Sequence, residues 1–365
     1  MKERIRKWHT AVVIMVGLAI AALFLLVLDG TTWFMSSRVT FSGYGQQMFC
    51  ELAAVIYVML MLLILGYQKV LTNRGEGFLK GFYIGGFMTA YCIYEIIAQF
   101  YLQRIGADAV VEPVGEILVF VITMFLIGFN EEMVFRGMLL NLFLDKFGNS
   151  KKGILTSVIA SGVIFGSVHL TNIFSGVSVG SAIIQAIEAA LLGILFAEIY
   201  LRSGNIWITV IAHALTDFAS MFSSGIFGKG DFIDSINRLS PINFVAIPIF
   251  LLPCILLFRK KKLEELVEKR NGRQIIPGEK DTEHMAITAL ILGILSIVLG
   301  CAGYGMGFGV VGMLGGYFAR KESKRGSALA TAGFVTSVVG TVVSAIGIVV
   351  MSFLMANVNG VMPTF

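Results

Sequence analysis

The sequence predicts an all-α polytopic membrane protein. Of its 365 residues, 56% are hydrophobic and only 14% are charged, which is too apolar for a soluble globular protein of this length. The apolar stretches are long and lack the alternating pattern of an outer-membrane barrel, so they predict helices. The chain has 41 glycines and only six prolines, a bias that suits closely packed transmembrane helices.

We expect about eight transmembrane helices in the first 258 residues. Basic clusters lie between the second and third spans, between the fourth and fifth, and after the eighth. All of these positions are on the cytoplasmic side when both ends of the bundle are cytoplasmic. The basic N-terminus resembles a signal sequence, but its apolar run is longer than usual and no cleavage site follows. We therefore expect a retained first span with a cytoplasmic N-terminus. The expected spans are 9–29, 47–67, 80–101, 115–145, 153–170, 180–201, 205–223 and 241–258.

The composition changes abruptly after the eighth span. Residues 259–284 are rich in charge and contain Asn-Gly and Pro-Gly pairs, which predicts a cytoplasmic extension of the eighth helix followed by a flexible linker. Residues 285–365 predict a second membrane module of two to three helices. Its glycines include Gly305, Gly309, Gly312 and Gly316, a spacing that lets helix backbones approach closely. We expect three regions: 1–258, 259–284 and 285–365.

The charge pattern limits the partners. The formal net charge of +5 comes from basic residues beside the spans, which favours contact with the lipid bilayer and gives no indication of nucleic-acid binding. The four cysteines are far apart in sequence and lie within or beside apolar runs, so they indicate neither a disulfide framework nor a thiolate metal site.

Three charges interrupt the fourth span near its middle. Glu131, Glu132 and Arg136 lie in an apolar run, where each charge costs roughly 2.5–3.5 kcal/mol on insertion scales. A helical ion pair between Glu132 and Arg136 gains only about 0.2–0.5 kcal/mol. The cost therefore favours a functional site inside the membrane, with a buried structural strut as the alternative.

Two of the four histidines also lie in apolar spans. His169 ends the fifth span, and His213 lies in the seventh span with Asp217 one helical turn further on. Either histidine alone would be read as a packing residue. Together with Glu131, Glu132 and Arg136, these residues supply a base, a proton carrier and a stabiliser of negative charge from three helices.

These motifs resemble those of a known family. Glu-Glu-x-x-x-Arg at Glu131, Glu132 and Arg136, Phe-x-x-x-His ending at His169, and His-x-x-x-Asp at His213 and Asp217 occur in order. The pattern is similar to the CAAX protease and bacteriocin-processing (CPBP) family of membrane proteases. The likeness covers about residues 80–225, so region 1–258 is expected to hold the protease bundle.

The resemblance implies an intramembrane endopeptidase of the glutamic type. Its substrates would be hydrophobic or membrane-anchored peptides, and we expect a bacterial cytoplasmic membrane as its location. Glu131 would be the general base, with His169 helping to hold or deprotonate the water. Glu132 and Arg136 would support the site, and His213 would stabilise the oxyanion. An ionised Asp217 would orient His213, since only Asn or a protonated Asp can donate to an oxyanion.

Metal dependence is the main chemical alternative. Glu131, His169, His213 and Asp217 offer nitrogen and oxygen donors that suit Zn²⁺, as in a metalloprotease. The sequence has no His-Glu-x-x-His motif, and the better understood relatives resemble metal-independent proteases. We therefore favour catalysis without a cofactor.

Two other functions compete with proteolysis. A non-catalytic bacteriocin-immunity or scaffold protein would keep the fold, but would have no need for the complete set of motif residues. A proton-coupled transporter would also place Glu, His and Asp in the membrane, but it predicts inverted repeats of broken helices, which the sequence does not show.

Overall fold

The computed structural model describes an all-helical protein. It describes residues 2–72, 110–229, 232–237, 241–271, 282–300, 305–322 and 328–359, with short stretches between 77 and 97. These residues contain helices and turns and no strands. They divide into two compact units, one formed by 1–81 and 104–275 and the other by 82–103 and 276–365. The proposed boundaries at 258 and 285 stay a prediction.

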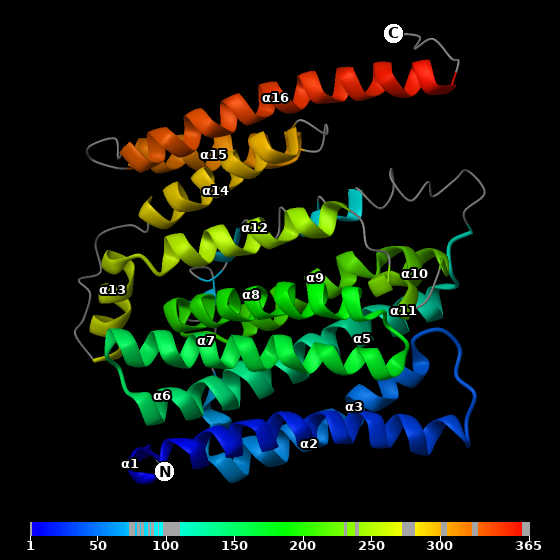
Figure 1. Cartoon of the computed structure of the whole chain (residues 1–365), viewed down its shortest axis with the longest axis vertical. Coiled ribbons are helices and arrows are strands. Elements are labelled where there is room, and N and C mark those ends of the chain that lie inside the picture. Colours follow the sequence, from blue (N-terminus) through cyan, green and yellow to red (C-terminus); the bar gives the residue numbers. More distant parts are fainter. Residues whose placement is uncertain are drawn as a thin grey trace. The chain divides into compact units, whose positions relative to one another are not determined.

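Unit 1 holds the predicted helical bundle (Figure 1). Helix α2 packs on α3, α3 on α5, α5 on α9, α7 on α8 and α8 on α12. Two short 3-10 segments, η1 and η3, follow α3 and α7, and a π-helix, η2, joins α5 to α6. The bounds are α1 Lys2–Lys7, α2 Thr10–Ser36, α3 Gly45–Leu65, η1 Gln68–Thr72, α5 Val114–Glu132, η2 Met133–Leu140, α6 Asn141–Phe147, α7 Lys151–Val168, η3 His169–Ser175, α8 Val179–Ser203, α9 Trp207–Ser220, α10 Phe222–Phe227, α11 Phe232–Asn237, α12 Pro241–Leu257 and α13 Lys260–Arg270.

Among the described residues, six helices are long and apolar enough to cross a membrane, which indicates an integral membrane protein. Large apolar side chains on them are exposed, as lipid-facing residues are: Leu26 is 65% exposed and Ile64 is 68% exposed. The six segments are Thr10–Ser36, Gly45–Leu65, Val114–Phe147, Lys151–Ser175, Val179–Ser203 and Ala328–Ile348.

The seventh expected span differs from the prediction. Helix α9 has 14 residues and is about 21 Å long, which is too short for a hydrocarbon core of about 30 Å. The helix ends at a break around Met221, and the six-residue helix α10 continues after it. The third expected span, 80–101, lies mostly outside the described residues.

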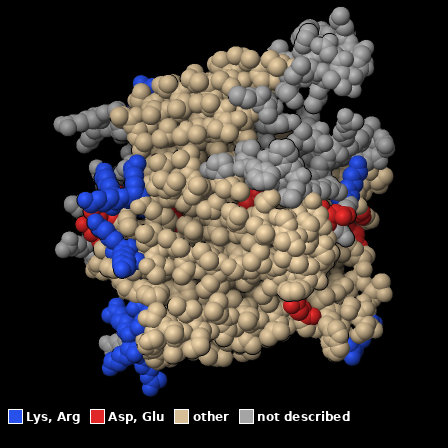
Figure 2. All heavy atoms as spheres, viewed as in Figure 1, with Lys and Arg blue, Asp and Glu red and all other residues tan. Residues whose placement is uncertain are grey.

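Basic side chains gather at one end of unit 1, where α1, α6 and α13 lie (Figures 1 and 2). The Lys146 ammonium donates to the carbonyl of Trp8 at 2.5 Å, which joins α6 to the first residues of the chain. Lys151 pairs with Glu264 at 2.5 Å across α7 and α13. This clustering is what the positive-inside pattern predicts for a cytoplasmic end.

Helix α13 is a separate helix that packs against α7 and α8 within unit 1, not the expected extension of the eighth span. Helix α12 ends at Leu257, and Arg259 takes an extended conformation before α13 begins. Leu263 and Leu266 pack in a buried apolar cluster with residues of α7 and α8. The predicted flexible linker can therefore begin only after this helix.

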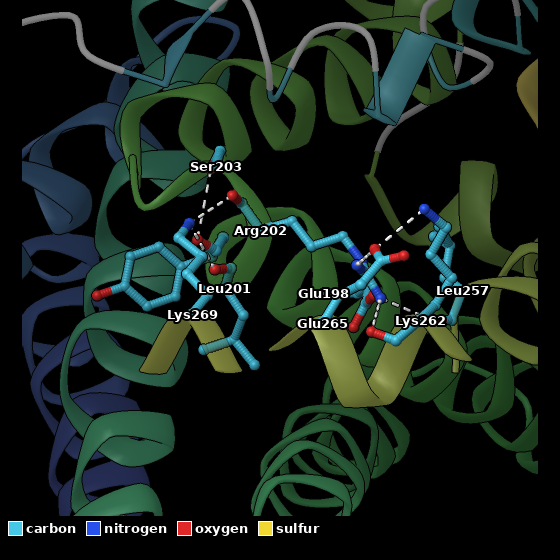
Figure 3. Close-up of polar contacts among 9 residues, drawn as sticks. Glu198, Leu201, Arg202, Ser203, Leu257, Lys262, Glu265 and Lys269 are labelled. Atoms are coloured by element: carbon cyan, nitrogen blue, oxygen red, sulfur yellow. Dashed lines mark hydrogen bonds and ion pairs between the residues drawn. The ribbon is translucent and has the colours of Figure 1, made fainter. Parts of the chain in front are cut away.

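Arg202, at the end of α8, ties α13 in place (Figure 3). Its guanidinium pairs with the buried Glu198 and donates to the carbonyls of Leu257 at 2.8 Å and Lys262 at 3.0 Å. Lys269 of α13 donates in turn to the carbonyl of Arg202 at 2.5 Å. Glu198 is therefore engaged in holding helices together.

In the described C-terminal part of unit 2, three helices pack on one another: α14 Thr282–Gly300, α15 Met306–Glu322 and α16 Ala328–Asn359. A Cβ built on Gly316 would lie 2.8 Å from the backbone nitrogen of Phe334, so α15 and α16 touch backbone to backbone there. Ser337 and Ser344 of α16 donate to carbonyls of α14 at 3.1 and 3.2 Å. The predicted close glycine packing is confirmed at Gly316.

Candidate active site

The fourth span changes its helical form directly after the two carboxylates. Glu131 and Glu132 are the last residues of α5, and the π-helix η2 covers the next eight residues. A π-helix is rare and occurs often at functional sites. Where it returns to α geometry, the Asn141 amide donates to the carbonyls of Arg136 at 3.1 Å and Gly137 at 3.0 Å. This side chain therefore satisfies carbonyls at the change of helical form.

Glu132 and Arg136 form a fully buried ion pair. Arg136 Nη1 lies 2.7 Å from Glu132 Oε1, and both side chains have no exposed surface. The Glu132 oxygen does not lie along the N–H bonds of the guanidinium, which has no hydrogen-bond partner in the described chain. It lies over the rings of Phe165 at 4.5 Å and Phe196 at 5.4 Å, so aromatic faces from α7 and α8 also stabilise the cation.

Helix α9 reaches this carboxylate pair because a glycine lets it approach α5. A Cβ on Gly128 would lie 2.8 Å from the backbone nitrogen of Ala214 and 2.9 Å from the carbonyl of Val210. The two backbones are therefore in contact one turn before the carboxylates. This contact brings His213 against Glu131 and Glu132.

His213 lies among three carboxylates. Its Nδ1 is 2.9 Å from Glu132 Oε1, and its Nε2 is 3.5 Å from Glu131 Oε2 and 3.7 Å from Asp217 Oδ2. The Glu131 and Asp217 side chains are 20% and 27% exposed, whereas Glu132 is fully buried. The Glu131 and Asp217 side chains thus keep some exposed surface, whereas the buried Glu132 contacts both His213 and Arg136 through its Oε1 atom.

His169 approaches the same place from α7. Its Nδ1 lies 2.9 Å from the carbonyl oxygen of Phe165. A carbonyl can only accept, so Nδ1 donates its proton and a neutral His169 has an unprotonated Nε2. The Phe165 ring makes edge contacts with both histidine rings, at centroid distances of 5.1 Å to His169 and 5.7 Å to His213. His169 therefore joins the group through Phe165.

Five of the six predicted site residues lie in one contact network, and the sixth shares an aromatic neighbour with it. Residues 113–219, which include all six, match the family model described as Type II CAAX prenyl endopeptidase Rce1-like. The chain therefore contains a CAAX endopeptidase domain. No curated protein and no solved structure matches the chain.

The CAAX endopeptidase domain also contacts a carboxylate that the sequence analysis did not single out. Glu51 of α3 is 2% exposed, and it accepts a hydrogen bond from Asn130 at 2.8 Å. Asn130 directly precedes Glu131 and is fully buried. A lone acidic residue within a span was the available signal, but its contact with α5 depends on packing that periodicity does not reveal.

The described part of the CAAX endopeptidase domain does not fit the alternative Zn²⁺ site. No three or more His, Cys, Asp or Glu side chains among the described residues are arranged to hold a metal ion. Glu131 and Asp217 each lie beside His213 Nε2, while Nδ1 of both histidines is taken by another partner. We derive no step through a metal.

Proposed function

We propose that the CAAX endopeptidase domain hydrolyses peptide bonds of hydrophobic or membrane-anchored peptides inside the bilayer. Membership of the family implies a protease. The observation that carries the proposal is the contrast between the adjacent carboxylates: Glu131 is partly exposed beside His213 Nε2, and Glu132 is buried and paired. A general base must be reachable by water, and only Glu131 of the two meets that requirement.

Glu131 takes a proton from water while the water oxygen attacks the peptide carbonyl. The new carbon–oxygen bond gives a tetrahedral oxyanion, and the same carboxyl group then returns the proton to the amide nitrogen, so that the carbon–nitrogen bond breaks and the amine leaves. His169 supports this step because its Nε2 can accept a hydrogen bond from the water. Its bond to the Phe165 carbonyl fixes the tautomer that this role requires.

His213 stabilises the negative charge that develops on the carbonyl oxygen. Glu132 can only accept as a carboxylate, so Nδ1 of His213 carries a proton. Nε2 faces Glu131 and Asp217, and the imidazolium is the form that satisfies both ring nitrogens. Asp217 therefore orients His213, and the Nε2–H group becomes the donor for the oxyanion.

We further propose eight membrane crossings in residues 1–258, with both ends of the bundle in the cytoplasm of a bacterial cell. The gathering of basic residues at the end that holds α1 and α13 supports this topology (Figure 2). Helices α9 and α10 together would form the seventh crossing, because the segment from the start of α9 to the end of α10 has 21 residues. Both termini of an even-numbered bundle lie on one side.

Two isosteric variants of neighbouring residues test the reaction. The full chain in lipid nanodiscs is incubated with a library of hydrophobic peptides, with and without chelator, and cleavage is followed by mass spectrometry. Glu131→Gln should abolish cleavage and keep the fold. Glu132→Gln, which retains an oxygen beside Arg136 and a hydrogen-bond acceptor for His213, should keep partial activity.

Three outcomes would overturn parts of the proposal. Wild-type turnover by Glu131→Gln would remove Glu131 as the base. Loss of wild-type activity on chelation would favour the metal-dependent mechanism. A wild-type protein that binds peptides without cutting any of them would favour an immunity or scaffold protein.

A further inference from the structure

Asn130 has an amide oxygen that is buried and lacks a hydrogen-bond donor among the described residues. The amide nitrogen donates both to the Glu51 backbone carbonyl at 2.9 Å and to Glu51 Oε2 at 2.8 Å. Because both of these partners are acceptors, they fix which end of the amide is nitrogen. The open atom is therefore an acceptor, and leaving a buried acceptor unpaired is costly.

Glu51 is held in the orientation that this arrangement needs. Its second carboxylate oxygen accepts from Gln47 at 2.8 Å, one turn earlier on α3. Gln47 is exposed and lines a polar cavity of about 650 Å³ that also includes Tyr44 and Ser224. Hydrogen-bonded side chains thus run from that cavity to the residue before Glu131.

Glu51 is joined to the reacting groups through Asn130, the residue directly before Glu131. Helix α3 therefore contributes to the same polar centre as α5, α7 and α9.

We propose that Glu51 and Asn130 are positioning residues of the active site. Through its two hydrogen bonds to the Asn130 amide, Glu51 fixes the end of α5 that carries the Glu131 carboxylate. This role rests on the proposed function, because it positions the base of that reaction. Neither residue takes part in the covalent step.

The test compares removal of the hydrogen bonds with removal of the charge alone. Glu51→Leu removes the charge and the side-chain hydrogen bonds. Glu51→Gln removes only the charge and keeps an acceptor for Asn130. With a peptide that the wild-type protein cleaves, kcat of Glu51→Leu should fall about tenfold, the factor for one lost hydrogen bond, with KM within about twofold. Glu51→Gln should stay within about threefold of wild type.

A matched control separates positioning from stability. Glu198 is another fully buried carboxylate, and its partner Arg202 holds α13 and lies outside the site. Glu198→Gln should lower the unfolding temperature and leave kcat of the folded protein unchanged. A Glu51→Leu protein with wild-type kcat, or with raised KM alone, would overturn the proposal.

A second variant applies if Glu51→Leu does not fold. Asn130→Asp keeps the size of the side chain and loses the amide hydrogens that bind Glu51, so its kcat should fall by a similar factor. Wild-type kcat in Asn130→Asp would overturn the proposal. Glu131→Gln is measured in parallel: if it is active, the proposed function itself fails, and if it is inactive, the result for Glu51 stands on its own.

Discussion

Glu132 Oε1 lies 2.9 Å from His213 Nδ1 and 2.7 Å from Arg136 Nη1. One buried oxygen thus joins the histidine of α9 to the arginine of the π-helix. Because this contact uses Nδ1, His213 has only Nε2 to offer to the partly exposed side, where Glu131 and Asp217 lie. Glu132 therefore determines which ring nitrogen of His213 faces the partly exposed side of the site.

Replacing the buried Glu132 should lower the free energy of unfolding more than replacing the partly exposed Glu131. Glu132→Leu leaves the Arg136 charge buried without its partner, and breaking a buried pair in this way costs about 3–5 kcal/mol. Glu131→Gln should change the free energy of unfolding much less. Reversible unfolding in mixed micelles measures both, and equal losses in the two variants would contradict the assigned division of roles.

Replacing His169 by Asn should remove activity and keep the fold. The Asn amide can still donate to the Phe165 carbonyl as Nδ1 does, but it has no group at the position of Nε2. We expect kcat to fall about 100-fold, at the lower end of what general acid–base groups contribute. The same change at His9, an N-cap residue where Asn is also suitable, is the control and should leave kcat unchanged.

Gly128→Ala should push α9 away from α5. The new methyl group would lie 2.8 Å from the Ala214 nitrogen, and such overpacking costs about 1–3 kcal/mol. Cleavage should fall with stability, because the contact aligns His213 with both carboxylates. Gly115→Ala on the same helix has open space and should be neutral in thermal unfolding and turnover; equal effects at both positions would refute the packing argument.

Helix α13 should loosen at acidic pH. A hydrogen bond from Lys151 lowers the pKa of the exposed Glu264 carboxyl below its ordinary value. A lowered pKa means that the contribution to docking is present at neutral pH and is lost as the pH falls through that pKa. Spin-label distances between α7 and α13 should therefore broaden in acid. They should broaden in high salt as well, since the pair is exposed.

Glu264→Gln supplies the control for this pH effect. The variant cannot form the ion pair, so its distance distribution should be broader at neutral pH and should change little on acidification. A distribution in the wild-type protein that stays narrow below the ordinary carboxyl range would show that Arg202 and the apolar contacts of Leu263 and Leu266 hold α13 alone.

The residues that the sequence analysis singled out lie near one another in the structure, but the contacts that join them could not be predicted. The charges in the fourth span, and the single turn between Glu132 and Arg136, follow from insertion cost and helical periodicity. That His213 would use Nδ1 toward Glu132 could not be predicted, because it depends on how closely α9 approaches α5 at Gly128. The catalytic roles themselves stay predictions.

The remaining differences have a common physical origin in tertiary contacts. Periodicity identified the apolar spans, but the break at Met221 and the docking of α13 depend on neighbouring helices. Glu51 was overlooked for the same reason, because its partner Asn130 is 79 residues away in the chain. No local pattern marks such a pair.

The π-helix makes the length of the fourth span matter as much as its composition. Deleting one residue from Met133–Leu140 would rotate everything beyond it by about 100° relative to α5. A deletion within residues 138–140 would also change the spacing between Asn141 and the carbonyls of Arg136 and Gly137. Natural variation in this segment should consist of exchanges of one side chain for another at constant spacing, while insertions and deletions collect in the turns outside it.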